Sequence, residues 1–202
     1  MSRRAVAEPA PVFRFDALAH RYFLDGLEIP HITGMLSDCG YIDDRWFTED
    51  GRDRGTLVHD LAAQYDLGAI TDPRTVECAE KGYFLAYVNV MRTVKPAWQF
   101  IETALASTTH GFGGRIDRGG TVWGAKAVME IKTGQRQVAT GIQLALQAIL
   151  VAPEWHLPPE AIVRYELDLK QTGKGALDEH VNRLDFAKAY EVIEACCRQG
   201  TR

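Results

Sequence analysis

Apolar and charged residues alternate through the segment VMEIKTG (128–134). Side chains of a β-strand point alternately to opposite faces of the sheet, so Met129 and Ile131 are predicted to enter a core while Glu130 and Lys132 share the other face. Taken alone, Glu130 and Lys132 are most simply an ion pair on an exposed strand, worth about 0–1 kcal/mol. A chemical role for the pair would require another acid that converges on it.

The N-terminal half of the chain predicts a hairpin and then helices. Aromatic and polar residues alternate across residues 13–30, on both sides of Asp25-Gly26, and such a pair favours the positive φ angles of a tight hairpin turn. Three helices are predicted next, a short one and two with apolar residues at helical spacing. They cover residues 32–40, 56–68 and 75–94.

After Pro96 the pattern changes to short β-branched or aromatic runs separated by glycines and charged turns. The predicted strands lie within residues 98–107, 110–120, 121–134 and 161–171. A strongly apolar helix (141–152) precedes the fourth of these segments, and a final helix is predicted from Asp185 to about Cys197. This order predicts an α/β (α+β) fold, with a central mixed β-sheet flanked by helices and an N-terminal hairpin and helices.

Composition sets limits on the protein class. A chain of 202 residues, 46% hydrophobic and 25% charged, suits a single domain (13–202) behind a mobile lead-in (1–12). No run approaches the roughly 18 apolar residues of a membrane span, and the lead-in lacks the apolar region of a signal peptide, so we expect a cytoplasmic protein without membrane contact. The net charge of −4 argues against coating nucleic acid by bulk attraction. The four cysteines form no CxxC pair, which argues against a zinc or iron–sulfur site.

Asp117 is the candidate for the converging acid. It ends the glycine-rich segment HGFGGRID (110–117), and glycines inside a strand indicate either close backbone packing beside a site or a bulge or tight hairpin. Residues 118–127, with their glycine pair, are predicted to be the return of a hairpin, which would place Asp117 opposite Glu130. Two carboxylates offer hard oxygen ligands to Mg²⁺ or Mn²⁺, and a lysine beside them can act on a metal-bound water.

These segments resemble a known family. The run GRID (114–117) followed by MEIK (129–132) resembles the signature of the PD-(D/E)XK nuclease superfamily, in which an acid and then (D/E)XK occupy adjacent strands. RGTLVH (54–59) and GIQLALQ (141–147) are similar to the histidine and glutamine motifs of its RecB-like and phage exonuclease branch. HRYFLDGLEIPHITGML (20–36) also resembles openings of phage members. The resemblance implies a restriction-endonuclease-like core, in agreement with the predicted order of elements.

The resemblance implies roles for individual residues. Lys132 would be the catalytic lysine, acting with Glu130 and Asp117. The implied metal ligands are His59, Asp117, Glu130 and the backbone carbonyl of Ile131. A helical histidine is otherwise usually structural or exposed, but the position of His59 at the end of RGTLVH favours a ligand role, either to the metal or to its water.

Other assignments stay open between two interpretations. Gln143 would orient the lysine strand or contact DNA, or would simply lie on the polar edge of a buried helix. Gln147 stands where the related motif usually has a tyrosine, so a base-stacking or phosphate-contacting role there is in doubt. Glu102 sits where related exonucleases often have another acid, and it equally fits a solvent-facing strand residue. DNA contacts are expected from arginines within or beside the motifs, namely Arg52, Arg54, Arg115, Arg118 and Arg136.

The implied function is a Mg²⁺- or Mn²⁺-dependent exonuclease that hydrolyses phosphodiester bonds at DNA ends, in phage-type recombination, replication or repair. DNA would be its main partner, and the resemblance also implies a single-strand annealing or recombination protein, a homo-oligomer, and the host cytoplasm for a phage-encoded chain. No nucleotide cofactor is expected, because no GxGxxG or P-loop sequence is present. Two alternatives stay open: a restriction-like or junction-cutting endonuclease of the same superfamily, and an inert DNA-binding or assembly module with the same fold.

Overall fold

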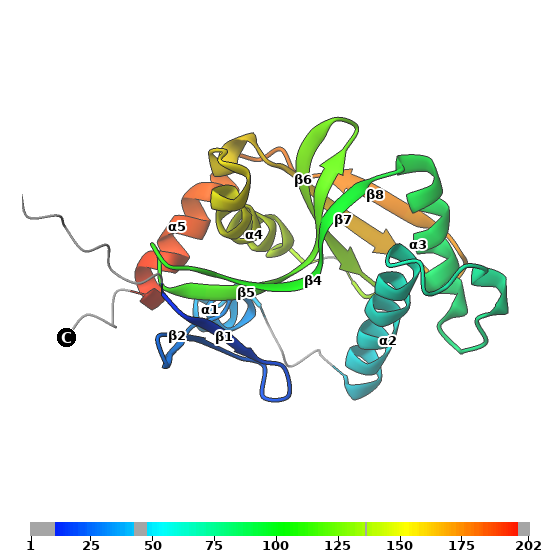
Figure 1. The fold of residues 1–202 in the computed structure, drawn as a ribbon, viewed down its shortest axis with the longest axis horizontal. Helices are drawn as coiled ribbons and strands as arrows, with labels where there is room; N and C mark the ends of the chain where they lie inside the picture. Colours follow the sequence, from blue (N-terminus) through cyan, green and yellow to red (C-terminus); the bar gives the residue numbers. More distant parts are fainter. Residues whose placement is uncertain (1–10, 43–47, 136, 198–202) are drawn as a thin grey trace, which may run out of the picture.

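The computed structural model describes residues 11–42, 48–135 and 137–197, and its centre is a mixed five-stranded sheet (Figure 1). The strands follow one another in sequence order across the sheet. They are β4 (Ala97–Ser107), β5 (Phe112–Val122), β6 (Ala125–Lys132), β7 (Val163–Leu169) and β8 (Gly175–Glu179). All neighbours are antiparallel except β6 and β7, which are parallel and joined through a helix. The predicted α/β class with a central mixed sheet is therefore confirmed, while β8 lies outside the predicted strands.

Helices cover both faces of this sheet (Figure 1). On one face lie α2 (Glu49–Asp66) and α3 (Lys81–Val94); on the other lie α1 (Ile32–Asp38), α4 (Thr140–Trp155) and α5 (Leu184–Cys197). Two single-turn 3₁₀ helices, η2 (Pro73–Thr75) and η3 (Pro159–Ala161), lie in the connections. The order helix, three strands, helix, strand is realised by α3 to β7, as predicted. Within the described residues, none of the helices is apolar over a stretch long enough to span a bilayer.

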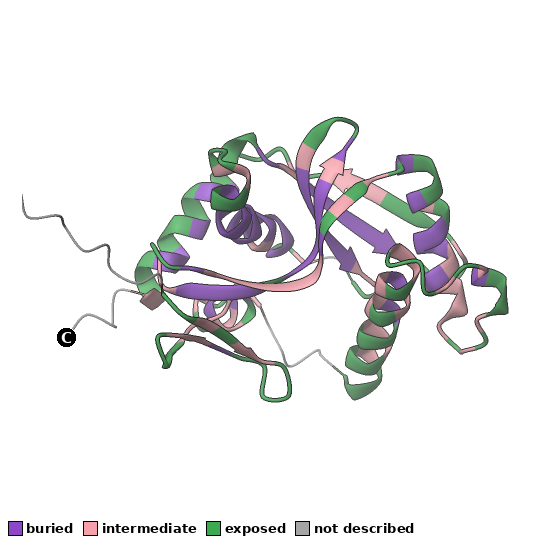
Figure 2. Ribbon diagram, viewed as in Figure 1, coloured by how far each residue is buried: buried purple, intermediate pink, exposed green. Residues whose placement is uncertain are grey.

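Strand β6 separates two apolar cores. Val128 packs in a cluster with residues of α1, α4 and α5, whereas Met129 and Ile131 pack in a second cluster with residues of α2 and α3. Glu130 and Lys132 project to the α4 side, where both contact Gln143. The alternation predicted for this strand is confirmed, and Figure 2 shows that long stretches of β5, β6, β7 and α4 are buried.

A smaller antiparallel sheet precedes the main one and docks against β5. It consists of β1 (Phe13–Asp16), β2 (Arg21–Leu24) and β3 (Leu27–Ile29). The β2–β3 turn has φ +49° at Asp25 and +80° at Gly26, as the sequence predicted. Gly113 makes the docking possible, because a Cβ on it would lie 2.6 Å from the ring of Tyr22. Close packing, rather than a bulge, therefore explains this glycine of the GFGG run.

Three predicted boundaries were wrong. Strand β5 continues to Val122 and the chain turns at Trp123-Gly124, so residues 118–127 are not the return of the hairpin. The pair Gly119-Gly120 lies inside β5 instead, where it lets the β4 backbone approach. Helix α2 begins well before residue 56, because the Thr48 hydroxyl accepts a hydrogen bond from the N–H of Gly51 and caps it. Helix α3 begins only at Lys81, after extended backbone at Val76. Most of the predicted lead-in, residues 1–10, lies outside the described residues.

Candidate active site

Acidic residues of neighbouring strands lie level with one another in the main sheet. Glu102 of β4 falls between two ladder pairs of the β4–β5 register, opposite Asp117 of β5. The β5–β6 ladder ends at Arg118 and Met129, so the next residues along, Asp117 and Glu130, face each other. The predicted approach of Asp117 and Glu130 is thus what the register produces, and Glu102 extends the row by one strand.

His59 reaches this row from α2 and bridges two strands. Its Nδ1 lies 3.0 Å from Glu102 Oε1, and its Nε2 lies 3.2 Å from the backbone carbonyl oxygen of Ile131. Both ring nitrogens face oxygen acceptors, so both donate and the ring is an imidazolium. Burial alone would lower the pKa of His59, but the carboxylates of Asp117 and Glu102 raise it to about 9.

Asp117 is a buried carboxyl held against strand β6. Its Oδ2 accepts a hydrogen bond of 2.9 Å from the backbone N–H of Ile131, and its Oδ1 lies 3.7 Å from Nδ1 of His59. Burial, together with the negative charge of Glu130, raises the pKa of Asp117 to about 7. Protons on His59 and Asp117 therefore offset the crowding of negative charge in this cluster.

Glu102 is aimed into the cluster by an unusual backbone conformation. Its φ is +46°, in the left-handed region that non-glycine residues seldom adopt. The side chain accepts hydrogen bonds from His59 and from Arg118, and Arg115 lies 3.2 Å from its second oxygen. Burial would raise the pKa of Glu102, but the hydrogen bond from His59 leads the interactions that hold it below its ordinary value. The interpretation as a solvent-facing strand residue is therefore wrong.

His59, Glu102 and Asp117 together form a set of donors suited to a divalent cation. Each offers a ligand atom, and these atoms lie within 4.8 Å of one another. Two carboxylate oxygens and an imidazole nitrogen suit Mg²⁺ or Mn²⁺, and the protons that the cluster holds are those a cation would displace. Glu102 belongs to this set, whereas Glu130, an expected ligand, lies outside it.

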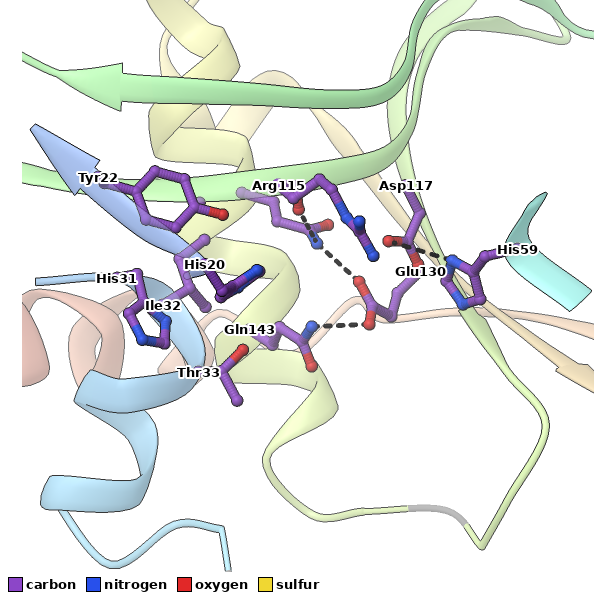
Figure 3. Close-up of a pocket in the computed structure, with 12 residues that line it drawn as sticks. His20, Tyr22, His31, Ile32, Thr33, His59, Arg115, Asp117, Glu130 and Gln143 are labelled. Carbon is purple, nitrogen blue, oxygen red and sulfur yellow. Dashed lines mark hydrogen bonds and ion pairs between the residues drawn. The ribbon is translucent and has the colours of Figure 1, made fainter. Parts of the chain in front are cut away.

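Glu130 is instead surrounded by hydrogen-bond donors on the α4 side (Figure 3). Its Oε1 accepts from Lys132 Nζ at 2.9 Å and from Gln143 Nε2 at 2.7 Å, and its Oε2 accepts from Gln147 Nε2 at 2.6 Å. Burial would raise the pKa of Glu130, but the Lys132 ammonium leads the interactions that lower it. The pKa of Lys132, which burial alone would lower, is raised in return by Glu130. Gln143 and Gln147 thus both hold Glu130 from α4, and the contact of Gln147 was missed in the sequence.

Arg118 does not lie at the surface, where a contact with DNA was expected. Its side chain is fully buried, where it donates to Asp66 at 2.5 Å, to Glu102 at 2.9 Å and to the backbone carbonyl of Asp117 at 2.6 Å. Tyr87 of α3 completes the network by donating to Asp66 at 2.5 Å. Arg118 therefore ties both helices of one face to the acidic row.

The other arginines that were expected to contact DNA lie in different environments. Arg115 lines the cavity beside the acids and is 43% exposed. Arg52 is exposed on α2, and Arg54 is half-buried with its guanidinium 5.7 Å from the ring of Tyr83. Arg136 lies outside the described residues.

The cavity that contains the acids has a volume of about 160 Å³. Besides His59, Asp117 and Glu130, its wall includes His20, Tyr22 and His31 of the N-terminal segment (Figure 3). Sequence reasoning placed this segment in a hairpin without giving its side chains a role. The close approach of Tyr22 to β5 depends on tertiary packing, and the motif resemblance was the only signal that connected the two regions.

The sequence matches no protein-family model and no curated protein. Among solved structures, the fold is similar to that of a protein from Eubacterium rectale named "Putative exonuclease", with a TM-score of 0.45 and 13% sequence identity. The similarity covers 82% of this chain and 71% of the other. A likeness at this level concerns general architecture, so we infer function from the geometry of the site itself.

Proposed function

We propose that this protein is a divalent-metal-dependent deoxyribonuclease that hydrolyses phosphodiester bonds as an exonuclease at DNA ends. The observation that carries the proposal is the convergence of His59, Glu102 and Asp117 beside the buried pair of Glu130 and Lys132. A cation-binding cluster next to an ordered lysine is suited to phosphodiester hydrolysis, and a merely structural ion pair would not need the three further groups.

The metal would be Mg²⁺ or Mn²⁺, held by Glu102, Asp117 and the deprotonated imidazole of His59, with the carbonyl oxygen of Ile131 close by. When bound, such an ion acidifies a water and polarises the phosphoryl oxygen. Ligation through His59 requires loss of a ring proton, because both nitrogens donate hydrogen bonds in this structure. Asp117 must lose its proton as well.

Lys132 would stabilise the negative charge that develops on the phosphoryl group. Its pKa is raised by Glu130, so the side chain is an ammonium that donates hydrogen bonds. Glu130 and Gln143 hold the Lys132 Nζ atom, at 2.9 and 3.1 Å. A charge held in place before the reaction needs no reorganisation during it, which is the main advantage of a site built in this way.

Cleavage assays test this proposal directly. End-labelled linear DNA and a closed circular plasmid would each be incubated with Mg²⁺, Mn²⁺ or EDTA, using the wild-type protein, Lys132→Ala and Lys126→Ala. Lys126 is a matched control because it lies on the same strand but interacts with Trp155 and Gln99, away from the acids. Degradation of linear DNA alone, abolished by EDTA and by Lys132→Ala, is the expected result.

The alternatives give different outcomes in the same assay. An endonuclease of the restriction-like or junction-cutting type would cut the circle. A catalytically inert DNA-binding or assembly module would cut neither substrate while staying folded. A role beside a single-strand annealing or recombination protein, and assembly as a homo-oligomer, belong to the same proposal; co-purification from cells and light scattering would test them.

A further inference from the structure

The cavity beside the acids has two chemically different ends. Among the described residues, the carboxylates that line it are Asp117 and Glu130, and both lie at the His59 end (Figure 3). The other end is formed by His20, Tyr22 and further residues of the N-terminal segment (Figure 3). A ligand that fits both ends must therefore present a group that binds a cation together with a second group that accepts hydrogen bonds.

The N-terminal wall is an ordered aromatic cluster. The rings of Tyr22 and His31 stack with centroids 5.8 Å apart, and His20 meets both edge-on at 5.5 and 5.2 Å. Tyr22 is 1% exposed, and its ring is set against the backbone of Gly113. The wall is thus fixed relative to β5, the strand that carries Asp117, and the two ends of the cavity keep a constant spacing.

The hydroxyl of Tyr22 is the key unexplained group in this wall. It is buried and lines the cavity, yet it has no hydrogen-bond partner among the described residues. Leaving such a group unpaired costs about 1–3 kcal/mol, and buried polar groups almost always have a partner. Burial raises the pKa of Tyr22 to about 12, so the hydroxyl keeps its proton and remains a donor near neutral pH.

Arg115 supplies positive charge between the two ends. Its Nε lies 3.2 Å from Glu102, its side chain is 43% exposed, and no hydrogen bond of the other guanidinium nitrogens is found among the described residues. A guanidinium has five N–H donors in a planar fork that matches the oxygens of a phosphate. Together with the Tyr22 hydroxyl and an N–H of the His20 imidazole, it forms a set of hydrogen-bond donors that favours an anion.

We propose that Tyr22, Arg115 and His20 form a subsite for the phosphodiester next to the scissile one on a single DNA strand, an inference that rests on the proposed nuclease function. Consecutive phosphates of one strand would then occupy the two ends of the cavity, one at the acids and one at the donors. The cavity of about 160 Å³ is smaller than the roughly 300–1,000 Å³ of typical ligand pockets. This size fits a section of the sugar–phosphate backbone of one strand.

Oligonucleotides with one neutral linkage test the subsite. A methylphosphonate would replace each linkage in turn along an end-labelled single strand, and the rate of cleavage at a defined bond would be measured with Mg²⁺. We expect a neutral linkage immediately beside the scissile bond to slow wild-type cleavage by about tenfold or more, since hydrogen bonds to charged groups are the strong ones. A neutral linkage several nucleotides away should have no effect.

The variant Tyr22→Phe identifies the protein side of this contact. It removes the hydroxyl and keeps the ring that packs on Gly113, so the fold is retained. Cleavage of unmodified DNA should slow by a factor similar to that of the adjacent neutral linkage, and the two changes together should cost less than their product. Tyr190→Phe is the matched control, because Tyr190, on α5, contacts His110 and does not line the cavity. His20→Asn provides a second variant, since asparagine tolerates the φ of +52° found at His20.

The outcomes separate this inference from the function on which it rests. If the wild-type protein cleaves no DNA, the nuclease proposal fails and the subsite fails with it. If the protein cleaves DNA but the adjacent neutral linkage has no effect, the subsite alone is overturned. The same holds if the effect of that linkage multiplies independently with the effects of Tyr22→Phe and His20→Asn. Coupling between the adjacent linkage and Tyr22→Phe, absent for Tyr190→Phe, establishes it.

Discussion

The carboxylate of Asp117 accepts a hydrogen bond of 2.9 Å from the backbone N–H of Ile131, at the point where the β5–β6 ladder has ended. The Asp117 side chain thus continues the hydrogen bonding between β5 and β6 beyond the end of their backbone pairing. The carbonyl oxygen of the same residue, Ile131, faces His59 at 3.2 Å. The separation of two strands therefore creates the opening in which the acids, the histidine and a backbone oxygen meet.

Asp117→Asn should abolish metal-dependent cleavage while leaving the metal-free protein at least as stable as the wild type. The substitution keeps the shape but removes a carboxyl that is costly to bury beside Glu130, as its raised pKa indicates. Activity should fall by more than about a hundredfold, which is the scale of losing one group that stabilises the transition state. Cleavage rates and thermal melts with and without Mg²⁺ check both parts; a metal-dependent rise in Tm that survives the change would show that Asp117 is not a ligand.

Without metal, the protein should lose stability as the pH rises. The pKa of Asp117 is raised from 3.8 to about 7 and that of His59 from 6.5 to about 9, so the folded state binds more protons than the unfolded chain across both ranges. The Asp117 contribution is lost between about pH 4 and 7, and that of His59 between about 6.5 and 9. Thermal melts in EDTA at a series of pH values measure this, with Asp117→Asn expected to flatten the lower part of the curve.

Added Mg²⁺ should reverse the loss of stability with rising pH, because the metal displaces the protons of Asp117 and His59. At a hundredfold excess over Kd, binding stabilises by about 2.7 kcal/mol, or roughly 5–10 °C in Tm for a domain of this size. The rise should be larger at pH 8.5 than at pH 6. Calorimetry in buffers of different ionisation enthalpy should detect released protons, and a binding enthalpy independent of the buffer would contradict this account.

Arg118→Met should destabilise the fold strongly. Removing one partner of a buried ion-pair network typically costs about 3–5 kcal/mol, and here Asp66 and Glu102 would both lose a fully buried cation. Urea unfolding gives the free-energy difference. Arg52→Met, at an exposed position of α2, is the matched control and should change stability by no more than about 0.5 kcal/mol. Equal stability of the two variants would rule out the network as a support of the site.

Gln147→Leu should shift the acidic limb of the pH–activity profile to higher pH. The change removes a 2.6 Å hydrogen bond to Glu130, and carboxylates that lose donors in a buried site become easier to protonate. Activity at low pH should therefore fall more than activity at high pH. Profiles of kcat/KM for the wild type and the variant make the comparison, and a uniform loss at every pH would indicate a packing defect instead.

Gly113→Ala should loosen the N-terminal sheet from β5. The new methyl group would lie 2.6 Å from the Tyr22 ring, a clash that typically costs about 1–3 kcal/mol. Gly134→Ala is the control, because a Cβ there meets no atom within 4 Å and the backbone is not in the left-handed region. Hydrogen exchange of residues 13–29 should accelerate in the first variant alone.

Much of the catalytic face could be predicted because it depends on local pattern. The alternation around Glu130 specifies which side chains share a face, whatever the rest of the chain does. Strand β8 was missed because GALDE has no β-branched or aromatic residue, and it forms by pairing with β7. The formation of β8 therefore depends on β7, and the residues of GALDE alone do not indicate that pairing.

For a related reason, the sequence left the role of Glu102 open between two interpretations and did not indicate the burial of Arg118. Glu102 enters the site through a positive φ that its residue type does not favour, and that conformation is determined by the surrounding strands. The burial of Arg118 depends on Asp66 and Tyr87, which come from two different helices. A charged residue beside a catalytic motif looks the same in the sequence whether it faces solvent or the interior.

The site joins both apolar cores, since His59 comes from α2 on one face of the sheet and Gln147 holds Glu130 from α4 on the other. Neither half of the molecule contains a working set of groups. A chain in which only one layer has packed on the sheet would therefore lack the cleavage activity that we propose. Partly folded or partly degraded chains would be inactive for the same reason.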